Sequence, residues 1–140
     1  MGLLTNSINE IREDVKNRFG DTNNYLVVIK KNKASTGFIN LFIIGGLLYP
    51  LLANRTFIIE FTSQGIYEKE ISNSTKGDYV LIPWNEISDF NIQRGNMDTV
   101  IEYYYLGKKI MYKVCYNGVP YKDNKENEYK LYNKDWNRVE

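Results

Sequence analysis

The sequence predicts one domain of the α+β class, mainly β, in which short antiparallel strands form a small barrel or sandwich between two terminal helices. Two patterns support this prediction. Apolar residues repeat at helical spacing near both ends of the chain, and short extended runs separated by turn residues fill the part between them. The 140 residues are 43% hydrophobic and 25% charged, which is the length and apolar fraction of a single domain with its own core.

The first predicted element is an amphipathic helix within residues 1–22, which we separate from a domain at 23–140. Charged residues fill one side of this helix, where Asp14 can reach Arg18 one turn later, and Gly20 supplies a stop. Because this side carries both signs of charge, we expect the helix to pack on the domain rather than to lie in a membrane surface. Its apolar side is formed by residues three and four apart: Leu4, Ile8, Ile11, Val15 and Phe19.

Strands are predicted wherever four to seven residues rich in Ile, Val, Tyr and Phe lie between turn residues. Their near-regular spacing is typical of a small barrel or sandwich. The predicted strands are 25–29, 56–62, 66–71, 79–82, 90–93, 100–105 and 110–116.

A second helix is predicted near residues 123–136. Tyr129, Tyr132 and Trp136 fall at i, i+3 and i+7, with charged residues outside this stripe. Aromatic stripes of this kind usually face a core, so we expect these three rings to pack on the sheet.

Residues 34–54 form a run of 21 residues without a charge. As a helix, its apolar part at 37–53 would span about 25 Å, short of the ~30 Å of a hydrocarbon core. We therefore favour a buried strand or helix with a turn at Gly45-Gly46. An insertion into one leaflet stays an alternative, because it would leave both flanks on the same side of the membrane.

Composition narrows the classes of function. The 18 Lys and Arg balance 17 Asp and Glu, so the net charge of +1 provides no field to attract nucleic acid. The chain has no His and one Cys, which excludes His-dependent triads, an internal disulfide and a thiolate zinc site. No common catalytic motif is present, and nothing fixes the separation of Glu60, Glu68 and Glu70 from Asp98 or Glu102. We expect no enzyme, no cofactor and no metal.

Three stretches carry a family resemblance. They are a glycine-rich apolar stretch at 37–53, a strand that runs into Phe61-Thr62-Ser63-Gln64-Gly65-Ile66-Tyr67, and the step Ile82-Pro83-Trp84-Asn85-Glu86-Ile87-Ser88-Asp89-Phe90. In this order, followed by a hairpin and a helix, they resemble the bacterial pleckstrin-homology-like (PH-like) domain proteins, many of unassigned function. The resemblance covers about residues 25–136. It implies a partly open antiparallel β-barrel made of two nearly orthogonal sheets, with the C-terminal helix at one end.

By analogy with this family, we expect a non-enzymatic binding or scaffolding module that acts through a protein partner or at a membrane surface. The alternative is a small membrane-associated protein, of the bacteriocin-immunity or stress-response type, anchored by residues 37–53. No secretory signal is evident, so we expect a cytoplasmic location with membrane association through 37–53 as an option.

A protein is the first candidate partner, a membrane surface or a second copy of the chain comes next, and we expect no nucleic acid. Phosphoinositide-binding relatives use a basic cluster between the first two strands; an apolar stretch follows the lysines here, so we do not expect that ligand. The candidate interaction residues are Lys30, Lys31, Lys33, Phe38, Phe42, Leu47, Leu48, Tyr49, Tyr103 and Tyr105.

Overall fold

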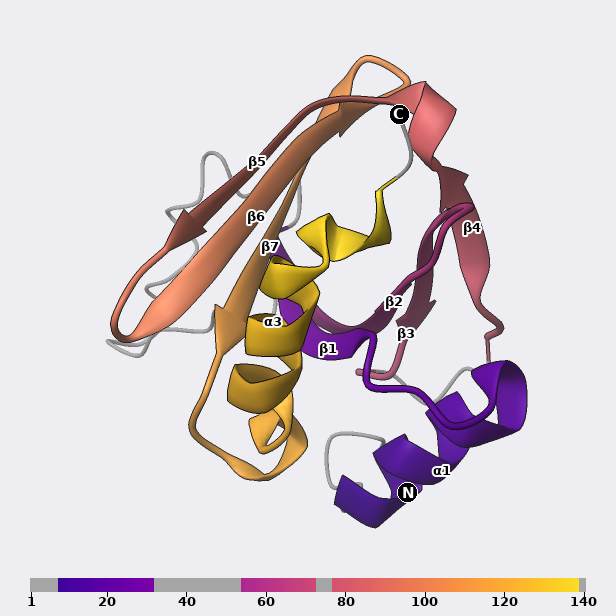
Figure 1. Cartoon of the computed structure of the whole chain (residues 1–140), viewed down its shortest axis with the longest axis vertical. Coiled ribbons are helices and arrows are strands. Elements are labelled where there is room, and N and C mark those ends of the chain that lie inside the picture. Colours follow the sequence, from indigo (N-terminus) through magenta and orange to yellow (C-terminus); the bar gives the residue numbers. More distant parts are fainter. Residues whose placement is uncertain (1–7, 32–53, 73–76, 139–140) are drawn as a thin grey trace, which may run out of the picture.

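The computed structural model describes residues 8–31, 54–72 and 77–138, and Figure 1 shows their arrangement. Both predicted helices and all seven predicted strands are present, which confirms the α+β class. The elements are α1 (Ile8–Phe19), β1 (Tyr25–Lys31), β2 (Asn54–Phe61), β3 (Gly65–Glu70), β4 (Val80–Pro83), η4 (Trp84–Glu86), β5 (Ile87–Arg94), β6 (Asp98–Tyr105), β7 (Lys108–Cys115), η5 (Val119–Tyr121), α3 (Asn124–Asn133) and η6 (Asp135–Asn137).

The seven strands form one antiparallel sheet in the order β4-β3-β2-β1-β7-β6-β5. β1 therefore joins two meanders, β1 to β4 and β5 to β7. It pairs with β2 along its whole length but with β7 at the three positions from Val28 to Lys30. β4 and β5 are the two ends of the order, so the sheet is not closed.

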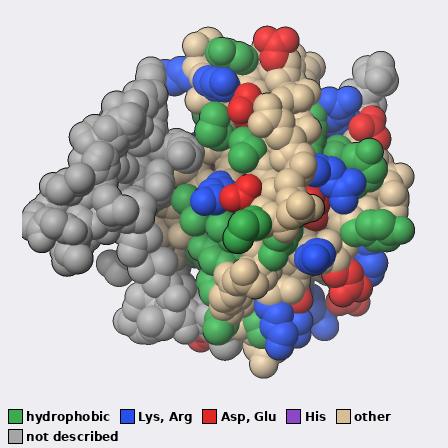
Figure 2. Space-filling view, turned by 90° about the vertical axis from the view of Figure 1, so that its left-hand side faces the viewer, with side chains coloured by type: hydrophobic (Ala, Val, Ile, Leu, Met, Phe, Trp, Pro, Cys, Tyr) green, Lys and Arg blue, Asp and Glu red, His purple; other side chains and the backbone are tan. Residues whose placement is uncertain are grey.

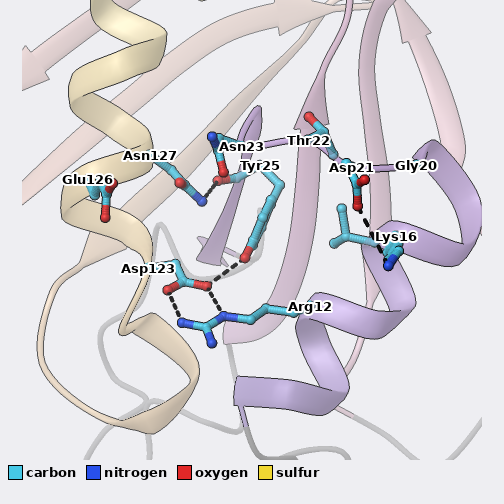
Figure 3. Close-up of a pocket in the computed structure, with 11 residues that line it drawn as sticks. Arg12, Lys16, Gly20, Asp21, Thr22, Asn23, Tyr25, Asp123, Glu126 and Asn127 are labelled. Carbon is cyan, nitrogen blue, oxygen red and sulfur yellow. Dashed lines mark hydrogen bonds and ion pairs between the residues drawn. The ribbon is translucent and has the colours of Figure 1, made fainter.

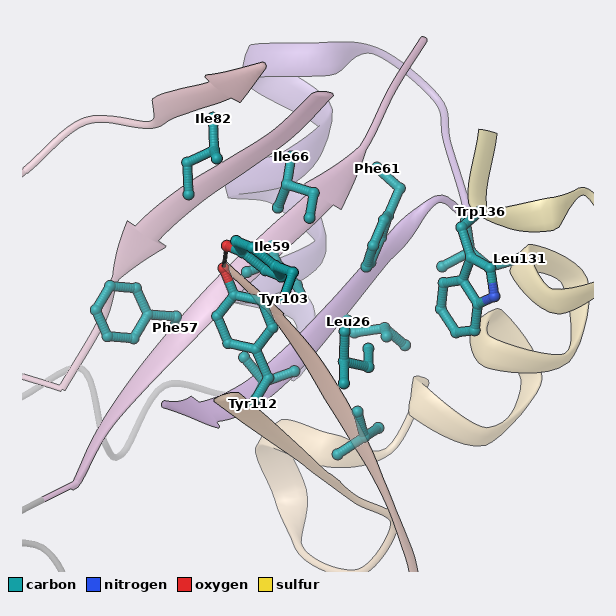
Figure 4. Packing of buried hydrophobic residues seen from close by; sticks show 13 residues of the cluster. Leu26, Phe57, Ile59, Phe61, Ile66, Ile82, Tyr103, Tyr112, Leu131 and Trp136 are labelled. Atoms are coloured by element: carbon teal, nitrogen blue, oxygen red, sulfur yellow. Dashed lines mark hydrogen bonds between the residues drawn. The ribbon is translucent and has the colours of Figure 1, made fainter. Parts of the chain in front are cut away.

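The curved sheet has a core on each face. On the concave face, alternate residues of the strands pack with Leu131 of α3 and Trp136 of η6, as Figure 4 shows. On the convex face, Ile11 and Val15 of α1 pack against β1, β2 and the end of β3. The two helices therefore lie on opposite faces of the sheet (Figure 1).

The predicted apolar face of α1 is confirmed for its described central part. Ile11 and Val15 are each 1% exposed, and Phe19 packs edge-on against Tyr67 and Tyr79; Leu4 lies outside the described residues. Asp14 does not use the neighbour predicted for it. Its carboxylate accepts hydrogen bonds from Lys69 (2.9 Å) and Tyr79 (3.0 Å), which tie α1 to the sheet.

The predicted stripe of the C-terminal helix is wrong for two of its three rings. Tyr129 is 62% exposed and Tyr132 is 50% exposed. Trp136 is buried, but it belongs to η6, which follows the end of α3. The buried face of α3 is mostly polar and consists of Asn124, Asn127, Glu128 and Leu131. The helix buries this polar face rather than the aromatic one because the polar groups find hydrogen-bond partners in the sheet.

Asn124 connects α3 to two strands at once. Its Nδ2 donates to the carbonyl oxygens of Val27 and Cys115, both at 2.8 Å, and its Oδ1 accepts from the N–H of Val27 at 2.9 Å. The backbone ladder between β1 and β7 ends at the Val28–Val114 pair. The amide of Asn124 thus bridges the two strands where their own pairing stops.

Gly65 holds β3 close to β4. The turn before it is closed by the N–H of Thr62, which donates to the Gly65 carbonyl at 2.9 Å. A Cβ at Gly65 would lie 2.1 Å from the carbonyl oxygen of Ile82, and φ is +152°. A tight turn therefore precedes β3, and it leaves no room for a side chain at Gly65.

Replacing Asn124 with Ala should lower the free energy of unfolding by about 3 kcal/mol, because two buried carbonyls and one buried N–H lose their partner. Urea unfolding followed by circular dichroism measures this. Lys125→Ala, at the exposed neighbouring position, is the control and should change stability by less than about 0.5 kcal/mol. A loss of the same size in both variants would contradict a bridging role for Asn124.

Candidate functional site

The residues on either side of positions 32–53 are partners in the sheet. The pairing of β1 with β2 ends at Lys31 and Asn54, which are direct partners. Opposite residues in an antiparallel ladder lie about 5 Å apart at their Cα atoms. A single membrane crossing would place these two ends on opposite sides of a bilayer, so the register is compatible only with an excursion that starts and finishes on one side.

Most of the predicted interaction residues belong to this excursion. Lys33, Phe38, Phe42, Leu47, Leu48 and Tyr49 lie outside the described residues. Lys31 is the last residue of β1. The structure thus places the attachment point of the segment, which we call the root and define as the Lys31–Asn54 pair.

Lys30, next to the root, is not a free cation. Its Nζ lies 3.0 Å from Glu68 Oε2 and 5.0 Å from the centre of the Phe57 ring. Tyr112 also donates a hydrogen bond to Glu68, and the hydroxyls of Tyr112 and Tyr103 share another. Burial raises the pKa of Tyr112 well above its ordinary value, so its hydroxyl keeps the proton that it donates.

Arg55, on the other side of the root, is half-exposed. Its guanidinium lies 3.4 Å from Glu70 and stacks 5.4 Å from the centre of the Phe57 ring. Lys30 and Arg55 therefore both contact the ring of Phe57 and each has a carboxylate partner. With its charge matched by a buried carboxylate, Lys30 is poorly suited to bind a phosphate.

The structure places Tyr103 and Tyr105, two of the predicted interaction residues, on the concave face of the sheet. Tyr103 has no exposed surface and Tyr105 is half-buried against the concave core. Tyr104 is 40% exposed and points to the convex side. Tyr103 therefore belongs to the core and not to an interaction surface.

A groove of about 390 Å³ runs between α1, the α1–β1 connection and α3 (Figure 3). Arg12 donates two hydrogen bonds to Asp123, at 2.8 and 2.7 Å, and the hydroxyl of Tyr25 donates a third at 2.6 Å. The guanidinium holds the pKa of Asp123 below its ordinary value. Because these groups bind each other, the groove connects α1 to α3 and offers few free donors to a ligand.

A second buried carboxylate anchors α3 from the other side. Glu128 accepts hydrogen bonds from Thr99 (2.8 Å) and Tyr116 (2.6 Å), and Arg94 Nε lies 3.4 Å away. Arg94 also stacks 4.1 Å from the centre of the exposed Tyr132 ring. On the face shown in Figure 2, hydrophobic, basic and acidic side chains are mixed, and no charge of one sign dominates it.

The carboxylates considered for catalysis do not converge. Glu60 and Glu68 lie on opposite faces of the sheet, because Glu68 pairs with Ile59, the residue before Glu60. Glu70, Glu102 and Asp98 each lie within 4 Å of a different cation, namely Arg55, Lys109 and Lys113. Within the described residues, no group of three Asp, Glu or Cys side chains could hold a metal ion.

Glu60 is the buried carboxylate that sequence reasoning left without a role. It is 3% exposed, and its Oε2 accepts one hydrogen bond from Thr22 Oγ1 at 3.1 Å. Its Oε1 is buried and has no hydrogen-bond partner among the described residues. Burial raises the pKa of Glu60 to about 7. The sequence pattern of β2 does not show that Glu60 is buried. The side chain occupies a position in the strand where an apolar residue would be expected.

Comparison with known family models, with curated proteins and with solved structures found no match for this chain. In the part of the chain that the structure describes, no helix is long and apolar enough to cross a membrane.

The pair at the groove can be tested by a double-mutant cycle of Arg12→Ala and Asp123→Ala. Because Arg12 is half-exposed, we expect a coupling energy of roughly 1 kcal/mol in the free energy of unfolding at neutral pH. The coupling should decrease in 1 M salt, where exposed charges are screened. Strictly additive effects of the two substitutions would show that the contact does not stabilise the docking of α1.

Proposed function

We propose that this protein is a non-enzymatic binding module that works at a membrane surface, attached through the uncharged segment. The observation that carries this proposal is the root. Lys31 and Asn54 are paired, so the residues that flank 32–53 lie next to each other at one end of the β1–β2 ladder. An insertion into one leaflet needs this geometry, because it leaves the whole domain on one side of the membrane.

The chemistry of the sequence around the root supports the same proposal. Residues 34–54 contain no charge, while Lys30, Lys31, Lys33 and Arg55 flank them. Apolar side chains gain about 1.5–3 kcal/mol each on full transfer out of water, and nearby cations are attracted to anionic headgroups. Of these four cations, Lys30 and Arg55 already have carboxylate partners.

We further propose that the domain is PH-like. Support comes from the chain order of seven antiparallel strands followed by a helix, and from the way α3 packs on the concave face of an open sheet. In this proposal the sheet domain presents a binding surface to a protein partner once the segment holds it at the membrane.

Flotation with lipid vesicles tests membrane attachment. The purified chain should float with vesicles of phosphatidylcholine and phosphatidylglycerol. Phe42→Asp and Leu48→Asp should each reduce the bound fraction at least about tenfold, because a carboxylate in the hydrocarbon region costs about 2.5–3.5 kcal/mol. Vesicles of phosphatidylcholine alone should bind less of the wild-type chain, since the anionic headgroups are missing.

Met97→Asp is the matched control. Met97 is 81% exposed in the β5–β6 connection, so the substitution adds the same charge away from the root and should leave flotation unchanged. A wild-type chain that stays in the aqueous fraction with both kinds of vesicle would overturn the membrane proposal. Equal losses in Met97→Asp and Phe42→Asp would also count against it.

A further inference from the structure

Glu60 lies beneath the connection that joins α1 to the sheet. In the sheet it is flanked by Tyr25 of β1 and Tyr67 of β3, its direct partners across the strands. Above them, Phe19 at the end of α1 contacts Tyr67. Among the described residues, Thr22 in the connection itself makes the one hydrogen bond that reaches the carboxylate. Glu60 is therefore covered by the last turn of α1 and by residues 20–24.

This cover is held by few bonds. The hydroxyl of Thr22 accepts from the N–H of Asn24 at 2.9 Å while it donates to Glu60. The carbonyl of Asn24 accepts from the N–H of Phe61 at 2.8 Å. Phe19 and the Arg18 guanidinium also contact the ring of Tyr67, and Lys134 Nζ donates a hydrogen bond to Asn24 Oδ1. A charged Glu60 would thus have one donor on Oε2 and none on Oε1 among the described residues.

We propose that Glu60 is a pH-sensitive latch: its protonated form keeps the end of α1 and residues 20–24 docked on the sheet, and its ionised form releases them. The proposal rests on the burial of a carboxylate that receives one hydrogen bond, from Thr22, and whose Oε1 has no partner among the described residues. It does not depend on membrane attachment.

The direction of the response follows from proton linkage. The ordinary pKa of the carboxyl is 4.5, and burial under the cover raises it to about 7. The docked state therefore binds more protons than the released state between these values, so docking is strongest below about pH 4.5 and weakens as the pH rises towards 7. The chain has no histidine, so no imidazole contributes to a response in this range.

The surrounding groups do not reverse this direction. From the end of α3, Lys134 favours the ionised form of Glu60 by its charge but does not offset the effect of burial. Tyr79, ahead of β4, and Tyr25 both have pKa values raised by burial and stay neutral. On α1, Asp14 is paired with Lys69 of β3, and Arg18 stacks 5.1 Å from the centre of the Tyr67 ring.

Hydrogen exchange tests the latch. In the wild-type chain, protection factors of amides in residues 8–24, corrected for the intrinsic exchange rate, should fall on the order of tenfold between pH 5.5 and pH 7.5. Glu60→Gln, which cannot ionise, should remove this fall. Glu86→Gln, at an exposed position, removes the same charge elsewhere and should behave like the wild type.

Two results would overturn the proposal. One is the same fall in protection between pH 5.5 and pH 7.5 in Glu60→Gln as in the wild-type chain. The other is exchange of residues 8–24 at the same rate as β1 at every pH, because release would then be global unfolding. Should Glu60→Gln not fold, Thr22→Val replaces it: loss of the donor to the carboxylate should move the transition to higher pH. A carbon-13 titration of the wild-type chain gives a direct check, since a Glu60 carboxyl that titrates near 4.5 excludes the latch.

Discussion

The amide of Asn124 is the contact on which the rest of the fold depends. Two meanders meet at β1 and β7, which share three residue pairs, and Asn124 continues the join with three hydrogen bonds to Val27 and Cys115. Because an amide accepts and donates in fixed directions, α3 has one position along the sheet at which all three bonds form. That position sets Leu131 and Trp136 into the concave core. The helix is thus placed by polar bonds, and its apolar contacts follow.

Buried carboxylates in this fold differ in how many donors reach them. Glu128 has hydroxyls from Thr99 and Tyr116 with Arg94 nearby, and Glu68 has Lys30 and a tyrosine hydroxyl. Tyrosine is abundant in this chain and supplies buried donors without adding charge. Glu60 has one threonine hydroxyl, so the same type of side chain is well satisfied at two sites and under-satisfied at the third. Glu60 and Glu68 both lie within strands, on opposite faces of the sheet. The number of donors that each receives therefore depends on which side chains cover that face.

Sequence patterns predicted the elements better than their buried faces. Strands 25–29 and 100–105 were recognisable because runs of strand-favouring residues and the turn residues that bound them are local features. The faces of α3 and of the Tyr103 run were not, because apolar character alone decides a predicted face, whereas Asn124 and Asn127 are buried through bonds to strands about 100 residues away in the chain. The uncharged segment next to the root is visible in the sequence, because residues 34–54 carry no charge. Its geometry required the register of β1 with β2, and the isolation of Glu60 required the path of residues 20–24.

The root and the latch lie at opposite ends of one strand pair. Glu60 pairs with Tyr25 at the start of β1, and Asn54 pairs with Lys31 at its end. Six residue steps at about 3.3 Å each place these ends roughly 20 Å apart. Energetic effects of sites separated by more than about 7–10 Å without shared partners are usually additive. Between these ends β1 and β2 are paired with each other at every position, so release of residues 20–24 leaves the register at Lys31 and Asn54 in place. A rise of pH at Glu60 would therefore expose the convex face of the sheet under the end of α1, while Lys31 and Asn54 stay paired.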